Sequence, residues 1–164
     1  MTNNDILRRV RYIFDLNDDK MISIFGQADR VVTRSEISDW MKSEENEEYK
    51  KLNDETLATY LNGFINEKRG KREGAQPVPE KRLTNNAIFM KLKIALNLQS
   101  EDIIEIMNLS EFVLSKHELS AFFRKEGHKH YRECKDQILR IFLKGLQIQH
   151  RKDDDSDEEF SWEK

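Results

Sequence analysis

The chain has 164 residues, enough for one ordinary domain or two small ones, and 36% of them are charged against 37% that are hydrophobic. Its net charge of −3 hides a division, because residues 153–164 carry seven acids and one lysine, so that residues 1–152 carry +3. A body with so small a positive charge lies well below the basic footprint of most nucleic-acid-binding proteins, and no apolar run is long enough to cross a membrane.

A single cysteine, Cys134, excludes an intramolecular disulfide framework. The first residues contain no apolar stretch of the kind that marks a secretory signal. These two features favour a soluble protein in a reducing compartment, and we expect it in the cytoplasm.

The first half of the chain predicts four helices. The short polar residues 3–5 are expected to cap the first helix, and a short second helix ends near Gly26. Thr33 and Glu36 have the spacing of a capping box at the start of the third helix. The residues expected to face inward are Ile6, Val10, Ile13, Phe14, Met21, Ile22, Ile24, Phe25, Ile37, Trp40, Met41, Leu57, Tyr60, Leu61, Phe64 and Ile65.

A basic linker at 68–84 follows the fourth helix. It contains both prolines and has a net charge of +4, and the chain then begins the same pattern again at Asn85. Ser100, Glu101 and Asp102 are expected to cap the second helix of this half, with the acids in its first turn, and Ser115 and Glu118 repeat the capping box. The second half therefore predicts the same four helices.

Equivalent residues in the two halves are separated by 82 positions. Examples are Tyr49 and Tyr131, Asp54 and Asp136, Leu57 and Leu139, Leu61 and Leu143, and Gly63 and Gly145. A gapless match of this kind indicates an internal duplication. We therefore predict an all-α fold of two tandem helical repeats of about four helices each, related by pseudo-twofold symmetry in one compact body. The expected segments are a first repeat at 1–67, the linker at 68–84, a second repeat at 85–150 and an acidic disordered tail at 151–164.

Gly63 and Gly145 interrupt apolar helix faces, where a glycine costs about 1 kcal/mol relative to alanine. We expect another helix to approach closely at both glycines, across the interface between the repeats. A notch that admits a ligand is the alternative interpretation.

The segment before and inside the last helix is rich in polar groups. A salt-bridged helix start explains most of them, because Arg132 and Asp136, or Asp136 and Arg140, lie four residues apart. The alternative is a polar pocket between the repeats, in which an arginine binds an anionic group. The candidate binding residues are Tyr131, Arg132, Asp136, Gln137 and Arg140.

Other groups of residues bear on nucleic-acid binding, metal binding and catalysis. Nucleic-acid binding is the alternative function, through the linker cations Lys68, Arg69, Lys71, Arg72, Lys81 and Arg82. His128, His130 and Cys134 are competent zinc ligands, but their spacing is no recognised zinc pattern, so we expect no metal and no cofactor. No nucleophile elbow, phosphate loop or carboxylate dyad is present, which places an enzyme third.

The chain resembles the YehS-like family of uncharacterised bacterial proteins, whose domain of unknown function occurs as two tandem copies. The matching residues include segments 4–8, 61–65, 67–71 and 85–86, together with His128, Lys129, Tyr131 to Cys134, Asp136, Gln137, Leu139, Arg140, Phe142, Leu143, Gly145 and Leu146. The resemblance implies the duplication and no mechanism. We expect a non-enzymatic binding or regulatory module that acts on a protein or small anionic ligand through the inter-repeat surface.

Overall fold

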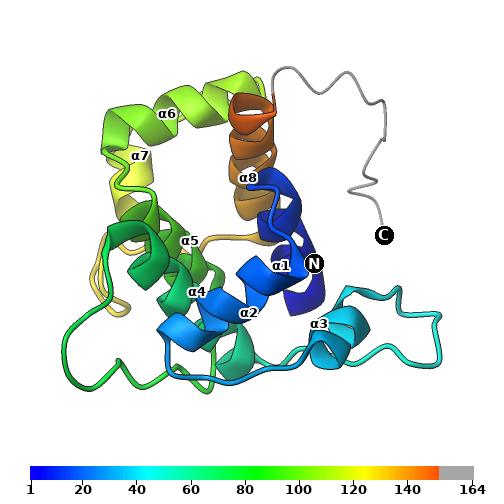
Figure 1. Ribbon diagram of the computed structural model, residues 1–164. Helices are drawn as coiled ribbons and strands as arrows, with labels where there is room; N and C mark the ends of the chain where they lie inside the picture. Colours follow the sequence, from blue (N-terminus) through cyan, green and yellow to red (C-terminus); the bar gives the residue numbers. More distant parts are fainter. Residues whose placement is uncertain (152–164) are drawn as a thin grey trace. The chain divides into compact units, whose positions relative to one another are not determined.

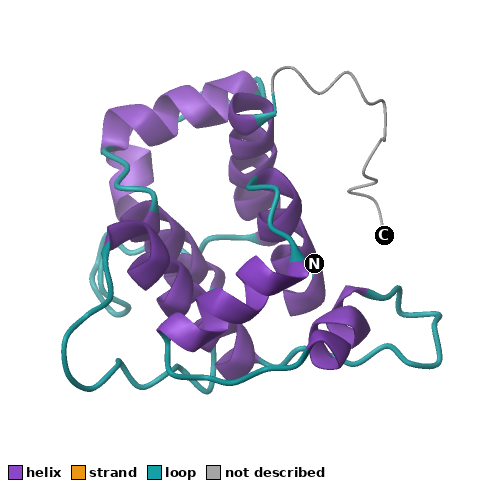
Figure 2. Cartoon of the chain, viewed as in Figure 1, coloured by secondary structure: helices purple, strands orange, loops and turns teal. Residues whose placement is uncertain are grey.

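The computed structural model describes residues 1–151, and these residues contain helices and loops but no strand (Figures 1 and 2). The acidic tail predicted at 151–164 lies, apart from its first residue, outside the described residues. The prediction of an all-α fold is confirmed. The helices are α1 (Asn3–Ile13), α2 (Asp18–Gln27), α3 (Arg34–Met41), α4 (Asp54–Arg69), α5 (Asn85–Ala95), α6 (Ser100–Leu109), α7 (Lys116–Ala121) and α8 (Asp136–His150).

The duplication extends to the ends of the helices. Each of α5 to α8 begins 82 residues after its counterpart among α1 to α4. The turns repeat as well, because Asp29 and Glu111 both adopt a left-handed conformation, with φ of 59° and 60°. The residue after each donates its backbone N–H to a carbonyl five residues earlier, which closes the C-terminus of α2 and of α6 in the same way.

The helix caps agree with the sequence in part. The capping boxes at Thr33 and Ser115 are present, with Glu36 and Glu118 completing them. The N-caps are Thr2 and Gln99, each one residue before the predicted capping segments at 3–5 and 100–102, and Asp5 and Asp102 from those segments accept the N–H groups of the two caps.

Asn4 has a different role from the predicted cap, because its side chain is fully buried. Its Nδ2 donates to the carbonyl oxygens of Trp40 and Lys50 at 3.1 and 2.8 Å, and its Oδ1 accepts the N–H of Leu52 at 2.9 Å. One amide therefore connects α1 to the end of α3 and to the loop that enters α4. Such a network satisfies backbone groups that no helix can pair.

By packing, the chain divides into one unit of residues 2–97 and a second that contains 98–151. The first unit holds α1 to α5, and its core contains the rings of Phe25, Tyr60 and Phe64, with Phe25 and Tyr60 centred 5.2 Å apart. The second unit holds α6, α7 and α8. The division by packing falls after α5, whereas the sequence repeat restarts at α5.

The linker is attached to the first unit by hydrogen bonds. Asn66 in α4 donates to the side-chain oxygen of Gln76 at 2.7 Å and accepts the backbone N–H of Arg72 at 3.3 Å. Farther along, the backbone N–H of Leu83 donates to the Asp54 carboxylate at 2.9 Å. The linker backbone therefore follows a defined path between α4 and α5.

The two glycines lie where one helix crosses another. A Cβ atom at Gly63 would lie 2.0 Å from the carbonyl oxygen of Ile24 in α2, and a Cβ at Gly145 would lie 2.1 Å from that of Ile106 in α6. The expectation of a close approach is confirmed at both glycines. Its predicted position between the repeats was wrong, because α2 crosses α4 inside one unit and α6 crosses α8 inside the other.

Alanine at either crossing should destabilise the protein. The obstructing atom is a backbone oxygen, so the helices must move apart, and overpacking of this kind costs about 1–3 kcal/mol. This cost exceeds the gain in helix propensity, about 1 kcal/mol. Urea denaturation of Gly63→Ala and Gly145→Ala measures the balance. Gly26→Ala is the matched control, since a Cβ there meets nothing within 4 Å, and this variant should gain stability.

The Asn4 network predicts a second stability effect. Asn4→Ala leaves two carbonyls and one N–H without their partner, and we expect a loss of about 2–4 kcal/mol of unfolding free energy. The exposed Asn108 in α6 provides the control, because Asn108→Ala should change stability by less than about 0.5 kcal/mol. Equal midpoints for the two variants in urea would show that the network contributes nothing.

Candidate binding site

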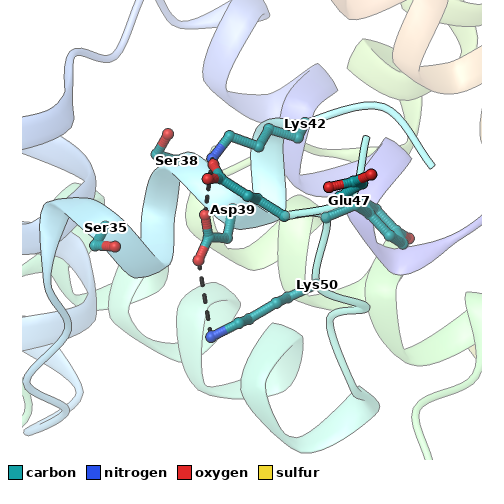
Figure 3. Close-up of a pocket in the computed structure, with 8 residues that line it drawn as sticks. Ser35, Ser38, Asp39, Lys42, Glu47 and Lys50 are labelled. Carbon is teal, nitrogen blue, oxygen red and sulfur yellow. Dashed lines mark hydrogen bonds and ion pairs between the residues drawn. The ribbon is translucent and has the colours of Figure 1, made fainter. Parts of the chain in front are cut away.

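A shallow polar hollow lies beside α3 in the first copy. It has a volume of about 370 Å³ and lies between α3 and the loop that follows it (Figure 3). The residues that line it are Ser35, Ser38, Asp39, Lys42, Glu47, Glu48, Tyr49 and Lys50. All of its hydrogen-bonding groups come from one helix and one short loop, so this hollow belongs to the first copy alone.

Asp39 is the centre of the charges in this hollow. Its carboxylate accepts Lys42 Nζ at 2.9 Å and lies 3.8 Å from Lys50 Nζ (Figure 3). Lys42 also donates to Glu48 at 2.5 Å. The hydrogen bond from Lys42 lowers the pKa of Asp39, and those to Glu48 and Asp39 raise the pKa of Lys42. Both side chains therefore stay charged near neutral pH, and neither is suited to transfer a proton there.

The same place in the second copy has the opposite charge. Residues 42–50 contain two lysines and four glutamates, a net charge of −2, whereas residues 124–132 contain four cationic residues and one glutamate, a net charge of +3. We call residues 124–132 the basic loop. Lys42 and Lys50 correspond to Arg124 and Arg132, and Asp39, which pairs with both lysines, corresponds to Ala121.

The backbone of the basic loop repeats that of the first copy. The N–H of Arg132 donates to Ala121 O at 3.0 Å, as that of Lys50 donates to Asp39 O at 3.2 Å. The N–H of Tyr131 donates to His128 O at 2.9 Å, as that of Tyr49 donates to Asn46 O at 3.0 Å. The two loops therefore differ in their charged side chains far more than in their hydrogen-bonded framework.

Aromatic rings organise the side chains of the basic loop. The rings of His117 and His130 are centred 6.2 Å apart, and those of His128 and His130 5.6 Å apart. The Arg132 guanidinium lies over the ring of the buried Phe122, 5.5 Å from its centre. A guanidinium held over an aromatic face keeps its N–H groups in plane and directed outward.

Charges near the loop affect two other groups. The pKa of Glu118 is lowered, first by its hydrogen bonds with Ser115 and then by the nearby positive charge of Arg132. The pKa of Tyr131 is raised, first by burial and then by the nearby carboxylates of Glu126 and Glu133. The phenol of Tyr131 is therefore neutral near pH 7 and can donate a hydrogen bond.

The structure separates the predicted site residues into two groups. Tyr131 and Arg132 lie in the basic loop, whereas Asp136, Gln137 and Arg140 belong to α8. The predicted pairing of Arg132 with Asp136 along a helix was wrong, since α8 begins only at Asp136. The Asp136 carboxylate accepts a hydrogen bond from the α-amino group of Met1, at a distance of 3.2 Å.

The sequence interpretation missed His117, Arg124 and Lys129 as part of the same surface. Comparison of positions 82 residues apart would have found Lys129, which replaces Glu47, and His117, which replaces Ser35. The contrast between the copies is the more informative signal.

The six linker cations proposed to bind nucleic acid differ in their contacts. All six are exposed, but Lys68 Nζ lies 5.3 Å from the ring centre of Phe14, and Lys71 pairs with Asp29 at 2.8 Å. Arg69, Arg72, Lys81 and Arg82 are the other four. In residues 1–151 no group of three His, Cys, Asp or Glu side chains is arranged to hold a metal ion.

Comparison with known proteins places the chain in a family. A model for proteins of unknown function, DUF1456, matches residues 3–70 and again 85–152. The chain belongs to the DUF1456 family. It is 42% identical over 147 residues to the uncharacterized protein YehS of Escherichia coli (strain K12). The aligned residues make up 89% of this chain and 94% of YehS. The predicted tandem duplication and family resemblance are confirmed.

No solved structure matches the chain. None of the helices in the described part of the chain is both long and apolar enough to cross a bilayer.

The buried thiol of Cys134 gives a chemical prediction. Burial raises its pKa to about 12, so the thiolate fraction at pH 8 is about one in ten thousand, against about a quarter for an exposed cysteine. The native protein should react with a thiol reagent such as DTNB far more slowly than protein unfolded in guanidinium. Because the folded state holds this proton more tightly, the stability from the buried thiol should decline as pH rises above about 8.5. Rapid stoichiometric labelling of the native protein would contradict the burial.

Proposed function

We propose that the protein is a non-enzymatic binding module whose basic loop engages an acidic segment of a protein partner. The observation that carries the proposal is the replacement of Asp39 by Ala121 at the same position of the same fold. In the first copy this carboxylate neutralises two cations internally. In the second copy Ala121 stands at that position and the basic loop has a net charge of +3, so an acidic segment of a partner can contact its exposed cations.

The exposure of the loop supports this assignment. Every residue of the basic loop is exposed except Tyr131, which is half-buried. Within residues 1–151, Arg124, Lys125 and Lys129 form no ion pair. Exposed cations of this kind increase the rate of encounter with an acidic partner and select against basic ones.

A protein partner suits the loop better than nucleic acid does. A net charge of +3 over nine residues matches a short acidic peptide, whereas affinity for duplex DNA rests on several phosphates spread along a helix. Nucleic-acid binding through the linker stays an alternative, since Arg69, Arg72, Lys81 and Arg82 are exposed. We also propose a cytoplasmic location, which a lone buried cysteine suits.

Binding of a labelled deca-glutamate peptide, followed by fluorescence anisotropy at low salt, tests the proposal. Ala121→Asp restores the internal counter-ion of the first copy, and Lys129→Glu with Arg132→Glu reverses the charge of the loop. We expect each change to weaken binding about tenfold or more, equivalent to about 1.4 kcal/mol.

The matched control reverses two exposed cations elsewhere. Lys81→Glu with Arg82→Glu makes the same change in net charge and should leave peptide binding unchanged. If the control weakens binding as much as the loop variants, the basic loop has no special role. If labelled single-stranded DNA binds and only the linker variant loses it, the nucleic-acid alternative replaces the proposal.

A further inference from the structure

We infer that the acidic C-terminal segment of this chain, residues 153–163, binds the basic loop of the same molecule and competes there with the acidic partner. The inference rests on the proposed function of that loop. The C-terminal segment would then regulate access of the acidic partner to the loop.

Charge complementarity is the first argument. Residues 153–163 contain seven carboxylates and no cation, whereas the nine residues of the basic loop have a net charge of +3. Ala121 stands where Asp39 supplies a carboxylate in the first copy. No other stretch of eleven residues in the chain has as many acids as residues 153–163.

The distance along α8 is compatible with this contact. The basic loop ends at Arg132, four residues before the start of α8, and the acidic segment follows the end of α8 at His150. A helix of 15 residues is about 22 Å long. Eleven extended residues span up to about 36 Å, so the segment can return along α8 to the loop.

The aromatic residues of the segment suit the same surface. Phe160 and Trp162 lie between acids, and Arg132 already lies over one aromatic ring, that of Phe122. Guanidinium groups bind carboxylates through paired hydrogen bonds and also stack on indole rings. A segment with both kinds of group can therefore contact the arginines in two ways.

Attachment to the same chain makes weak binding effective. A short tether gives an effective concentration in the millimolar range, which lets a weak contact compete with an external partner. The expected consequence is a lower apparent affinity of the full chain for acidic peptides. Salt should weaken the contact, because exposed charges provide most of it.

The direct test uses backbone amide NMR of the full-length protein. The variant has Asp153, Asp154, Asp155 and Asp157 changed to Asn, and Glu158, Glu159 and Glu163 changed to Gln. We expect amide shifts in residues 124–132 and none in the equivalent residues 42–50. The shift differences should not change on tenfold dilution. Absence of shifts in the basic loop would overturn the inference, and a dependence on dilution would assign the segment to a second molecule instead.

The deca-glutamate assay then separates this inference from the proposed function. The neutralised variant should bind the peptide about tenfold more tightly than the parent. This gain in affinity should vanish in about 0.5 M salt, because salt screens interactions between exposed charges. Changing Glu44, Glu45 and Glu47 to Gln is the control and should produce no gain. If Arg132→Glu still weakens binding but neutralisation brings no gain, the inference fails and the proposed function remains. If no variant changes peptide binding but the loop amides still shift, the proposed function fails by itself.

Discussion

The crossing of a helix carbonyl over a glycine fixes the geometry of each copy. At Gly63 and at Gly145 the missing side chain lets α2 approach α4, and α6 approach α8, until a backbone oxygen fills the space that a Cβ would need. The helices that carry these glycines also bury large rings, among them Tyr60 in α4 and Phe142 in α8. Because the crossing involves backbone atoms, the rest of each copy can change its side chains and keep the same arrangement of helices.

The regular features of the fold were predictable from the sequence. Capping boxes at Thr33 and Ser115 and the register of 82 residues depend on local spacing, which a single sequence displays. The role of Asn4 was not predictable, since its partners lie 36 to 48 residues away and are mostly backbone carbonyls that no sequence pattern marks. The position of the glycine crossings was missed for the same reason: a glycine indicates a close neighbour without saying which helix provides it.

The candidate site shows a similar division. The sequence identified Tyr131 and Arg132 as part of a polar segment, but it assigned them to a helix that begins only at Asp136. The more informative comparison was between Asp39 and Ala121, and its meaning depends on knowing that Lys42 and Lys50 share that one carboxylate. The duplication provides an internal comparison, because Lys42 and Lys50 pair with Asp39 in the first copy, whereas the second copy has Ala121 at that position.

The hydrogen-bonded linker has a consequence for proteolysis. Its composition, with cations at Arg69, Lys71, Arg72, Lys81 and Arg82, offers many trypsin cleavage positions. A protease needs several residues in an extended and detached conformation, yet Asn66 and Asp54 fasten this backbone at both ends. Cleavage between the copies therefore requires these fastenings to open first. The rate of cleavage in the linker would report local opening of the first unit. The chain would stay intact in conditions where a free peptide with the linker sequence is cut.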